Sequence, residues 1–219
     1  INIKIIENEI KNIIYYEDKF LIGKSDAKSD NFDSLYFARR DLSSATIPSF
    51  IRYIKPYSFE QCCQLETIEF PENSELKSIE KFSFYQSAIK NISLPVHITE
   101  IGDYAFYFSN LKRVRIHKNS EIRMIGKLAF DNSSIEWFSI PINIPIIKEK
   151  SFSQCNKLKM VEVSEKSKLQ VIENEAFYNS AIEKFSIPSC LTVISEFSFA
   201  LCLNLKIFTI PSNSELREI

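Results

Sequence analysis

The sequence has few of the residues on which nucleotide-binding and metal-binding motifs depend. Its 3 glycines, Gly23, Gly102 and Gly126, are isolated. A dinucleotide fingerprint needs G-x-G-x-x-G and a P-loop needs G-x-x-x-x-G-K-[ST], because glycine lets the backbone approach a phosphate. The 2 histidines, His97 and His117, offer little material for a His-based triad or a metal cluster. The sequence therefore disfavours nucleotide enzymes, hydrolases and zinc proteins, and we expect no cofactor and no metal.

An excess of one charge and long apolar runs are also missing. The 27 Lys and Arg balance 28 Asp and Glu to a net charge of −1, whereas nucleic-acid binding needs a clearly basic domain. The most apolar stretch, 138–147, is broken by Pro141 and Pro145 and is too short to span a bilayer. Residues 1–10 include acidic and amide side chains and do not resemble a signal peptide. We therefore expect no nucleic-acid partner and no membrane insertion within this segment.

Seven copies of one short motif run through the chain. The motif is Ile-x-x-x-[Ser/Ala]-Phe, and its phenylalanines are 25, 22, 24, 22, 25 and 22 residues apart. Long and short coils therefore alternate in pairs of 46 or 47 residues. Periods of 20 to 50 residues are typical of stacked repeat proteins. The motif phenylalanines are Phe59, Phe84, Phe106, Phe130, Phe152, Phe177 and Phe199.

A second motif, apolar-x-x-apolar-x-apolar, begins five or six residues after each of these phenylalanines. The alternation over its last residues predicts a short strand. An additional copy, Leu42/Ala45/Ile47, precedes the first Phe motif and extends the array toward the N-terminus. The central strand residues of the seven copies are Ile68, Ile92, Val114, Phe138, Val161, Phe185 and Phe208.

One such coil cannot bury its Ile and Phe side chains alone, but stacked coils place identical residues in ladders around one shared core. The β-branched Ile suits strand-like stacking, and one Phe per coil can form an aromatic spine along the convex side. We expect Pro, Asn and Ser to form the corners, which would explain the low glycine content. The repeats therefore predict a solenoid.

The order of these motifs resembles the BspA-like leucine-rich repeats, and the stretch Ile101-Gly102-Asp103-Tyr104-Ala105-Phe106 is among the best matches. The resemblance covers the chain from about residue 42 to its end, and the paired coils look like the versions found in parasitic protists. It implies a right-handed leucine-rich repeat solenoid with a parallel β-sheet on the concave face, and short helical or 3-10 turns and loops on the convex face. It also implies a cell-surface or extracellular protein that adheres to host cells, extracellular matrix or other microbes. The family is not known for an active site.

Residues 1–41 lack both motifs, and we expect them to form an N-terminal cap with a β-hairpin. The runs 10–23 and 32–40 are strand-like, and the polar segment 24–31 is typical of a hairpin loop. A solenoid needs a cap because its end coil exposes apolar ladders. Residues 42–219 then form an array of about seven coils. Because Ile219 aligns with the Ile that opens each Phe motif, we expect the array to be truncated there.

Three of the 5 cysteines occupy one ladder position. Cys62, Cys155 and Cys202 each follow the motif Phe by three residues, where the other coils have Ser. Neighbouring strands lie about 4.8 Å apart, so Cys155 and Cys202, two coils apart, are about 10 Å apart and beyond disulfide reach. We therefore expect buried free thiols. The sequence assigns no role to Cys63 and Cys190.

Two N-x-[Ser/Thr] sequons occur, at Asn91 and Asn132. Asn91 would point out of the concave sheet, where a glycan would block binding, so we interpret it as an ordinary strand residue. The sequence leaves modification of Asn132 open.

The outward residues of the concave strands are the natural ligand contacts of a solenoid, because the sheet holds them rigidly and leaves them exposed. Trp and Arg are enriched in interface hot spots, and the chain has its single Trp in the middle of this row. The alternative is that these side chains only cover the sheet, since singly exposed apolar residues are normal. The predicted partner-binding patch consists of Arg113, Arg115, Trp137, Met160, Lys184 and His117.

The repeats predict a non-enzymatic binding module. The resemblance to the BspA-like family implies that this module belongs to an adhesin-like surface protein and holds a protein or matrix ligand on the concave face. The alternative is an intracellular scaffold with the same fold, which free thiols and the lack of a signal peptide in this segment suit. An enzyme is disfavoured because no nucleophile, base and orienting group occur together, and a flat sheet offers no enclosed pocket. The identity of the ligand, the membrane anchor and the oligomeric state stay open.

Overall fold

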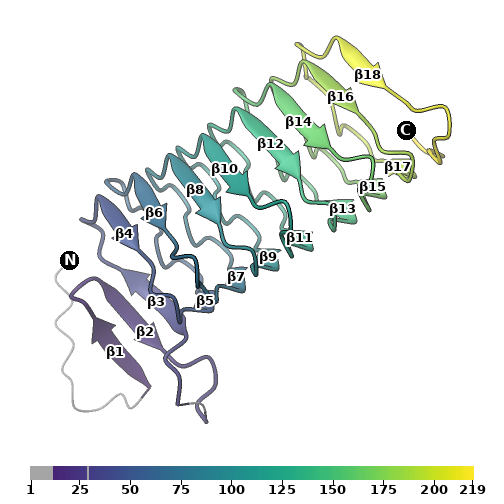
Figure 1. The fold of residues 1–219 in the computed structure, drawn as a ribbon. Helices are drawn as coiled ribbons and strands as arrows, with labels where there is room; N and C mark the ends of the chain where they lie inside the picture. Colours follow the sequence, from purple (N-terminus) through teal and green to yellow (C-terminus); the bar gives the residue numbers. More distant parts are fainter. Residues whose placement is uncertain (1–11, 29) are drawn as a thin grey trace.

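The computed structural model describes residues 12–28 and 30–219, which form a parallel β-solenoid of about eight turns. Figure 1 shows the largest sheet running along the whole stack, with the N-terminal hairpin at one end. We call this eight-stranded sheet the main sheet. Its strands are β4 (Ser44–Thr46), β6 (Thr67–Glu69), β8 (Asn91–Leu94), β10 (Arg113–Ile116), β12 (Trp137–Ile140), β14 (Met160–Val163), β16 (Lys184–Ser186) and β18 (Ile207–Thr209).

The predicted strand motif forms the main sheet, because its alternation turns every second side chain into the core. The central residue of each strand from β4 to β16 is buried, and the residues on either side of it are exposed or half-buried. Neighbouring strands are parallel, and the number of residue pairs that two neighbouring strands align alternates between one coil and the next, as the coil lengths do. β8 with β10 and β12 with β14 align four residue pairs each, whereas β10 with β12 and β14 with β16 align one each.

A second set of strands, of two residues each, lies across the stack from the main sheet (Figure 1). The set is interrupted between β11 and β13. The interruption occurs at Pro145, the residue just before β13, because proline has no N–H to donate to the preceding coil. In the next coil, the equivalent residue Gln170 does have an N–H, and it donates to the Pro145 carbonyl. These strands are β5 (Tyr53–Ile54), β7 (Ser78–Ile79), β9 (Glu100–Ile101), β11 (Met124–Ile125), β13 (Ile146–Ile147), β15 (Val171–Ile172) and β17 (Val193–Ile194).

The N-terminal segment adds β1 (Ile13–Tyr16), β2 (Phe20–Gly23) and β3 (Ser34–Ala38) to this second set. β1 and β2 are antiparallel and are joined through Glu17 and Asp18, which have φ values of 47° and 54°, as a tight primed turn requires. The run 10–23 therefore contains two strands and a turn rather than the single strand we expected. Its residues 10 and 11, like all of 1–11, lie outside the described residues.

The predicted loop between the two strand-like runs connects β2 to β3, which are antiparallel. Asp33, which follows the predicted loop and precedes β3, is buried, and its carboxylate accepts hydrogen bonds from the backbone N–H and the hydroxyl of Ser25 at 2.8 Å and 2.7 Å. β3 then pairs in parallel with β5. The hairpins are thereby joined to the first coil through continuous backbone hydrogen bonding.

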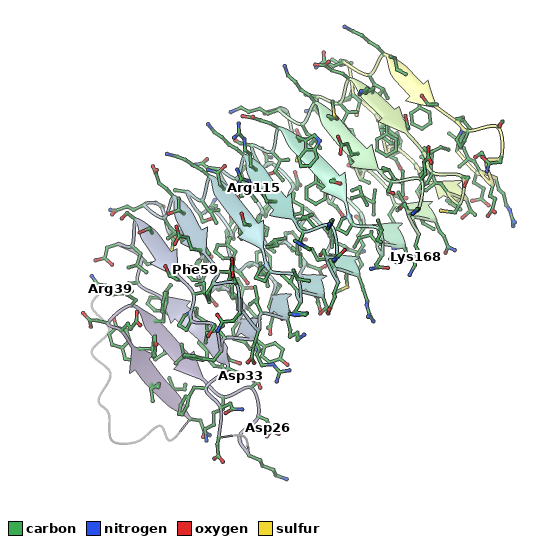
Figure 2. The ribbon with its side chains drawn as sticks, in the orientation of Figure 1. Asp26, Asp33, Arg39, Phe59, Arg115 and Lys168 are labelled. Carbon is green, nitrogen blue, oxygen red and sulfur yellow. The ribbon has the colours of Figure 1, made fainter. Side chains whose placement is uncertain are left out.

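The motif phenylalanines form the predicted aromatic spine. Consecutive rings stack with centroids 4.9 to 5.4 Å apart and interplanar angles of 1° to 17°. The rings from Phe59 to Phe177 have no exposed surface, and Phe20 of β2 packs edge-on against Phe59. Phe59 is labelled in Figure 2 near the N-terminal end of the stack. The spine is thus part of the hydrophobic core and runs from the N-terminal hairpin to the last coils.

The segments around these phenylalanines are turns rather than the helical or 3-10 turns we expected, because the described residues contain no helix. Each turn places two residues in the left-handed region, with φ between 51° and 62°. One lies two positions before the motif Phe and the other lies two positions after it. In the third turn, Tyr104, Phe106 and Phe108 donate their N–H groups to carbonyls of the next coil at 2.8, 2.8 and 3.0 Å. A helix would use these N–H groups internally, so it could not join one coil to the next. We call these stacked turns the turn face.

The expected corners of Pro and Ser occur, because the Ser74 and Ser214 N–H groups donate to the carbonyls of Pro71 and Pro211. The turn face adds a second explanation for the low glycine content. The left-handed positions of the turn face hold Tyr, Phe, Leu, Lys and Glu as well as Asn and Gln, and no glycine has positive φ. Such residues cost about 1 to 2 kcal/mol each in this conformation, and the hydrogen bonds between turns offset that cost. Glycine is used for close approach instead. A Cβ on Gly126 would lie 2.4 Å from the backbone nitrogen of Asp103 in the preceding coil.

We expect the variant Phe130→Ala to lose about 3 to 5 kcal/mol of unfolding free energy, because it leaves a cavity in the middle of the spine. Phe197→Ala is the matched control, since the Phe197 ring is 65% exposed. Urea unfolding followed by circular dichroism measures both. A wild-type midpoint for Phe130→Ala would contradict the placement of this ring in the core.

Asp131 is a buried carboxyl residue of the turn face. Its side chain is 6% exposed, and its Oδ1 atom has no hydrogen-bond partner. Burial raises the pKa of this carboxyl to about 6, and the charge of Lys150 partly opposes the shift while that of Glu175 adds to it. The folded protein therefore holds a proton on Asp131 between about pH 4 and 6, where the unfolded chain has released it.

Asp131 should consequently make the protein less stable as pH rises from 4 to 6, with the full loss present above pH 6. We expect Asp131→Asn to raise the unfolding free energy at pH 7.5 by about 1 to 2 kcal/mol and to have much less effect at pH 4.5. Urea midpoints of both proteins at the two pH values measure this difference. An equal effect at both pH values would show that the charge of Asp131 is not the cause.

Candidate functional site

The predicted patch lies on the exposed face of the main sheet. Arg113, Trp137, Met160 and Lys184 are direct register partners on the adjacent strands β10, β12, β14 and β16. They are exposed, except for Met160, which is half-buried. Arg115 points to the same side as Arg113, two residues further along β10, and Figure 2 labels it over this strand. The structure thus brings five of the six predicted residues together.

His117 is the sixth predicted residue, and it follows the end of β10 rather than lying in the sheet. Its imidazole Nδ1 accepts a hydrogen bond from the backbone N–H of Asn119 at 3.1 Å, so the side chain helps to fix the wide loop of this long coil. His117 is exposed, but this local contact explains it without a ligand.

A hollow of about 290 Å³ opens in the exposed face of the main sheet, over β6, β8 and β10. Arg113 and Arg115 line one side of it, and the side chains of Thr67 and Glu69 lie two strands away on the other. β8, between them, exposes the side chains of Asn91 and Ser93. The hollow is open because, in one outward row, the short Ser93 lies between the longer Glu69 and Arg115. Its further lining residues are Ile68 and Ile92.

The residues other than the arginines that line this hollow were not in the predicted patch. The signal that could have identified them is the side-chain length along one outward row, which falls from Glu69 to Ser93 and rises again at Arg115. The hollow lies on one side of β10, and Trp137, Met160 and Lys184 lie on the other. The predicted patch is therefore two neighbouring regions that meet at the arginines.

The charges of the arginines are unopposed. Among the residues that the structure describes, neither Arg113 nor Arg115 forms an ion pair or a side-chain hydrogen bond. The nearby Lys90, one residue before β8, is instead paired with Glu66 at 2.5 Å. Glu162, the acidic residue on β14, is separated from Arg115 by β12, which has the half-buried Ser139 at that row. Two guanidinium groups on one rigid strand are thus free to meet an anionic group.

Cys62, Cys155 and Cys202 occupy the predicted ladder. All five are free thiols, and Cys62, Cys155 and Cys202 are buried. Burial raises the pKa of the Cys155 thiol to about 12, and its S–H donates to the carbonyl of Phe130 at 3.1 Å, so this thiol is unreactive. Cys190 donates to the carbonyls of Ser167 and Leu169 at 3.1 and 3.2 Å, which gives it a structural role. Nothing in the structure explains the exposed Cys63.

The sequons lie in different surroundings. Asn91 is exposed on β8, as expected, and lines the hollow. Asn132 is half-buried in the turn face with φ of 57°, and its N–H donates to the Ser153 carbonyl. Modification of Asn132 stays open.

Aromatic residues on the turn face form a second ladder. Tyr57, Phe82 and Tyr104 stack with centroids 5.2 and 4.5 Å apart, and Tyr85 stacks on Tyr107 at 5.6 Å. In such a stack each ring covers the faces of its neighbours and leaves mainly edges to the solvent. Because ligands such as sugars pack against ring faces, this ladder is better explained as stabilisation of the turns.

Residues 12–28 and 30–219 contain no cluster of three or more His, Cys, Asp or Glu side chains that could hold a metal ion. They also contain no helix long and apolar enough to cross a membrane.

Comparisons with known proteins agree with this architecture. The family model for the BspA type leucine rich repeat region matches residues 30–159 and 123–219, in six copies. No curated protein matches the chain in sequence. Because the identities to the similar solved structures are below 25%, those structures show the fold alone.

Three solved structures are similar along most of this chain. The pneumococcal vaccine antigen PcpA has 24% identity and a TM-score of 0.60, with 94% of this chain and 60% of that chain covered. A leucine rich cell surface protein of Faecalibacterium prausnitzii has 22% identity and a TM-score of 0.54, with 93% and 53% covered. The leucine rich repeat protein of T. pallidum has 17% identity and a TM-score of 0.56, with 88% and 90% covered. This chain thus spans less than two thirds of the first two proteins.

Proposed function

Because the chain belongs to the BspA type leucine-rich repeat family, we propose that it is a non-enzymatic module that binds a protein partner on the exposed face of its main sheet. The observation that carries the proposal is the pair of unopposed arginines, Arg113 and Arg115, beside the exposed Trp137. Arg and Trp are the residue types that contribute most to protein interfaces. Backbone hydrogen bonds between parallel strands hold these residues in place before binding, which lowers the entropic cost of association.

We further propose that the module belongs to an adhesin-like surface protein that attaches to host cells, extracellular matrix or other microbes. The names of PcpA, a vaccine antigen, and of the cell surface protein of F. prausnitzii support a surface location. The paired long and short coils support a source among parasitic protists on resemblance alone, although the similar solved structures are bacterial. In this proposal β1, β2 and β3 act as the cap that covers the apolar end of the array.

A second candidate is an intracellular scaffold that binds protein partners with the same face. The observation in its favour is that all five cysteines are free, since free thiols persist in reducing compartments and disulfides are typical of secreted proteins. Both candidates use the same face of the main sheet and differ in where the protein is found.

The double variant Arg113→Ala/Trp137→Ala should weaken binding to a protein partner at least about tenfold, because it removes two hot-spot side chains from a rigid surface. Purified fibronectin, laminin and collagen, immobilised for surface plasmon resonance, serve as the first partners. The matched control is Arg123→Ala/Phe197→Ala, which removes an exposed Arg and an exposed aromatic ring away from the main sheet. Equal affinity of a folded double variant and the wild type would exclude this face as the binding surface.

Antibody labelling of intact cells separates the two candidates. We expect an antibody raised against residues 12–219 to stain unpermeabilised cells, with an intracellular protein as the control for membrane integrity. Staining that appears only after permeabilisation would contradict the adhesin proposal and favour the scaffold.

A further inference from the structure

We propose that the hollow over β6, β8 and β10 binds a sugar ring that carries a carboxylate and free hydroxyl groups. This inference rests on the proposed function, because it names a ligand class for the same face of the main sheet. It concerns the region of the face that the predicted patch did not include, where Thr67, Glu69, Asn91 and Ser93 lie beside the two arginines.

The arginine side of the hollow fits a carboxylate. Arg113 and Arg115 are two residues apart on β10, so their Cα atoms are about 7 Å apart and their side chains leave the same face of the sheet. A guanidinium group presents its N–H donors in a planar fork that matches the two oxygens of a carboxylate. Neither arginine has an acidic partner among the described residues, so a bound carboxylate would displace no existing ion pair.

The other side of the hollow fits hydroxyl groups. The Glu69 carboxylate accepts hydrogen bonds, and it lies two strands, about 10 Å, from the arginines. Between them, Asn91 offers both a donor and an acceptor, and the hydroxyls of Ser93 and Thr67 do the same. A ligand that satisfies all these groups has an anionic group that meets the arginines. It also has several hydroxyl donors that reach Glu69, about 10 Å away on the other side of the hollow.

An acidic peptide satisfies this arrangement less well than an acidic sugar. A run of carboxylates that reached the arginines would also bring negative charge toward Glu69, and like charges at short range oppose binding. A neutral sugar would leave the arginines without a counter-charge. Trp137, exposed beside Arg113 on β12, adds an aromatic surface next to the hollow on which a second sugar could pack.

Calorimetric titration of the chain with three probes tests this inference. The probes are a hyaluronan tetrasaccharide, which carries glucuronate carboxylates, a chitin tetrasaccharide, which is neutral, and a short polyglutamate peptide. We expect the hyaluronan probe to bind more tightly than the other two and to bind more weakly as salt is added. Binding of the neutral sugar with equal affinity, or tighter binding of polyglutamate, would overturn the inference.

Two variants locate the interaction. Arg115→Gln should weaken hyaluronan binding about tenfold or more, because one charge-assisted contact is lost, whereas the exposed Arg123→Gln, before β11, should not change it. Glu69→Gln should weaken hyaluronan binding and strengthen polyglutamate binding. An equal effect of Arg115→Gln and Arg123→Gln would show that the sugar binds through general charge, and would overturn the site.

The outcome for the sugar is separable from the outcome for the proposed function. If the Arg113→Ala/Trp137→Ala variant loses a protein partner and wild type binds none of the three probes, the main sheet face is a protein-binding surface and the sugar site is wrong. If wild type binds hyaluronan through Arg115 and none of the protein partners, the sugar site stands and the protein-binding proposal fails.

Discussion

The structure depends on the hydrogen bonding of each coil to the next. A single coil has no partner for the outward N–H and C=O groups of its strands and turn, and it cannot bury its Ile and Phe side chains. Stacking satisfies both needs, because the backbone ladders fix the spacing at which the rings of the Phe spine meet, with centroids 4.9 to 5.4 Å apart. The spine in turn fills the core along the whole stack.

This dependence explains features that are unusual in an ordinary globular domain. Bulky residues such as Tyr57 and Phe82 tolerate left-handed conformations, since their N–H groups donate to the next coil and their rings stack on each other. Pro145 removes one donor, and the short-strand ladder stops there while the main sheet continues. Several parallel ladders therefore make the stack tolerant of a defect in one of them.

The exposed face of the main sheet is where the coils differ from one another. The inner side of each strand is constrained by packing, but the outward residues change from Asn91 and Ser93 on β8 to Arg113 and Arg115 on β10 and Trp137 on β12. Because the ladders hold these side chains rigidly, a change in residue length between strands becomes a hollow and a change in charge becomes a local field. Binding properties can thus vary without cost to the fold.

The sequence alone determined the solenoid, the Phe spine, the cysteine ladder and the rows of outward residues, because each depends on a period that is written seven times. The tertiary structure decided features that do not follow from the repeat: the conformation of the turns, the division of the run 10–23 and the shape of the exposed face. The turns are non-helical because their N–H groups bond to the next coil, and the run 10–23 divides at Glu17 and Asp18. The hollow beside Arg113 and Arg115 depends on side-chain lengths on three strands that are brought together by stacking. A motif defines one coil, but a surface is a property of neighbouring coils.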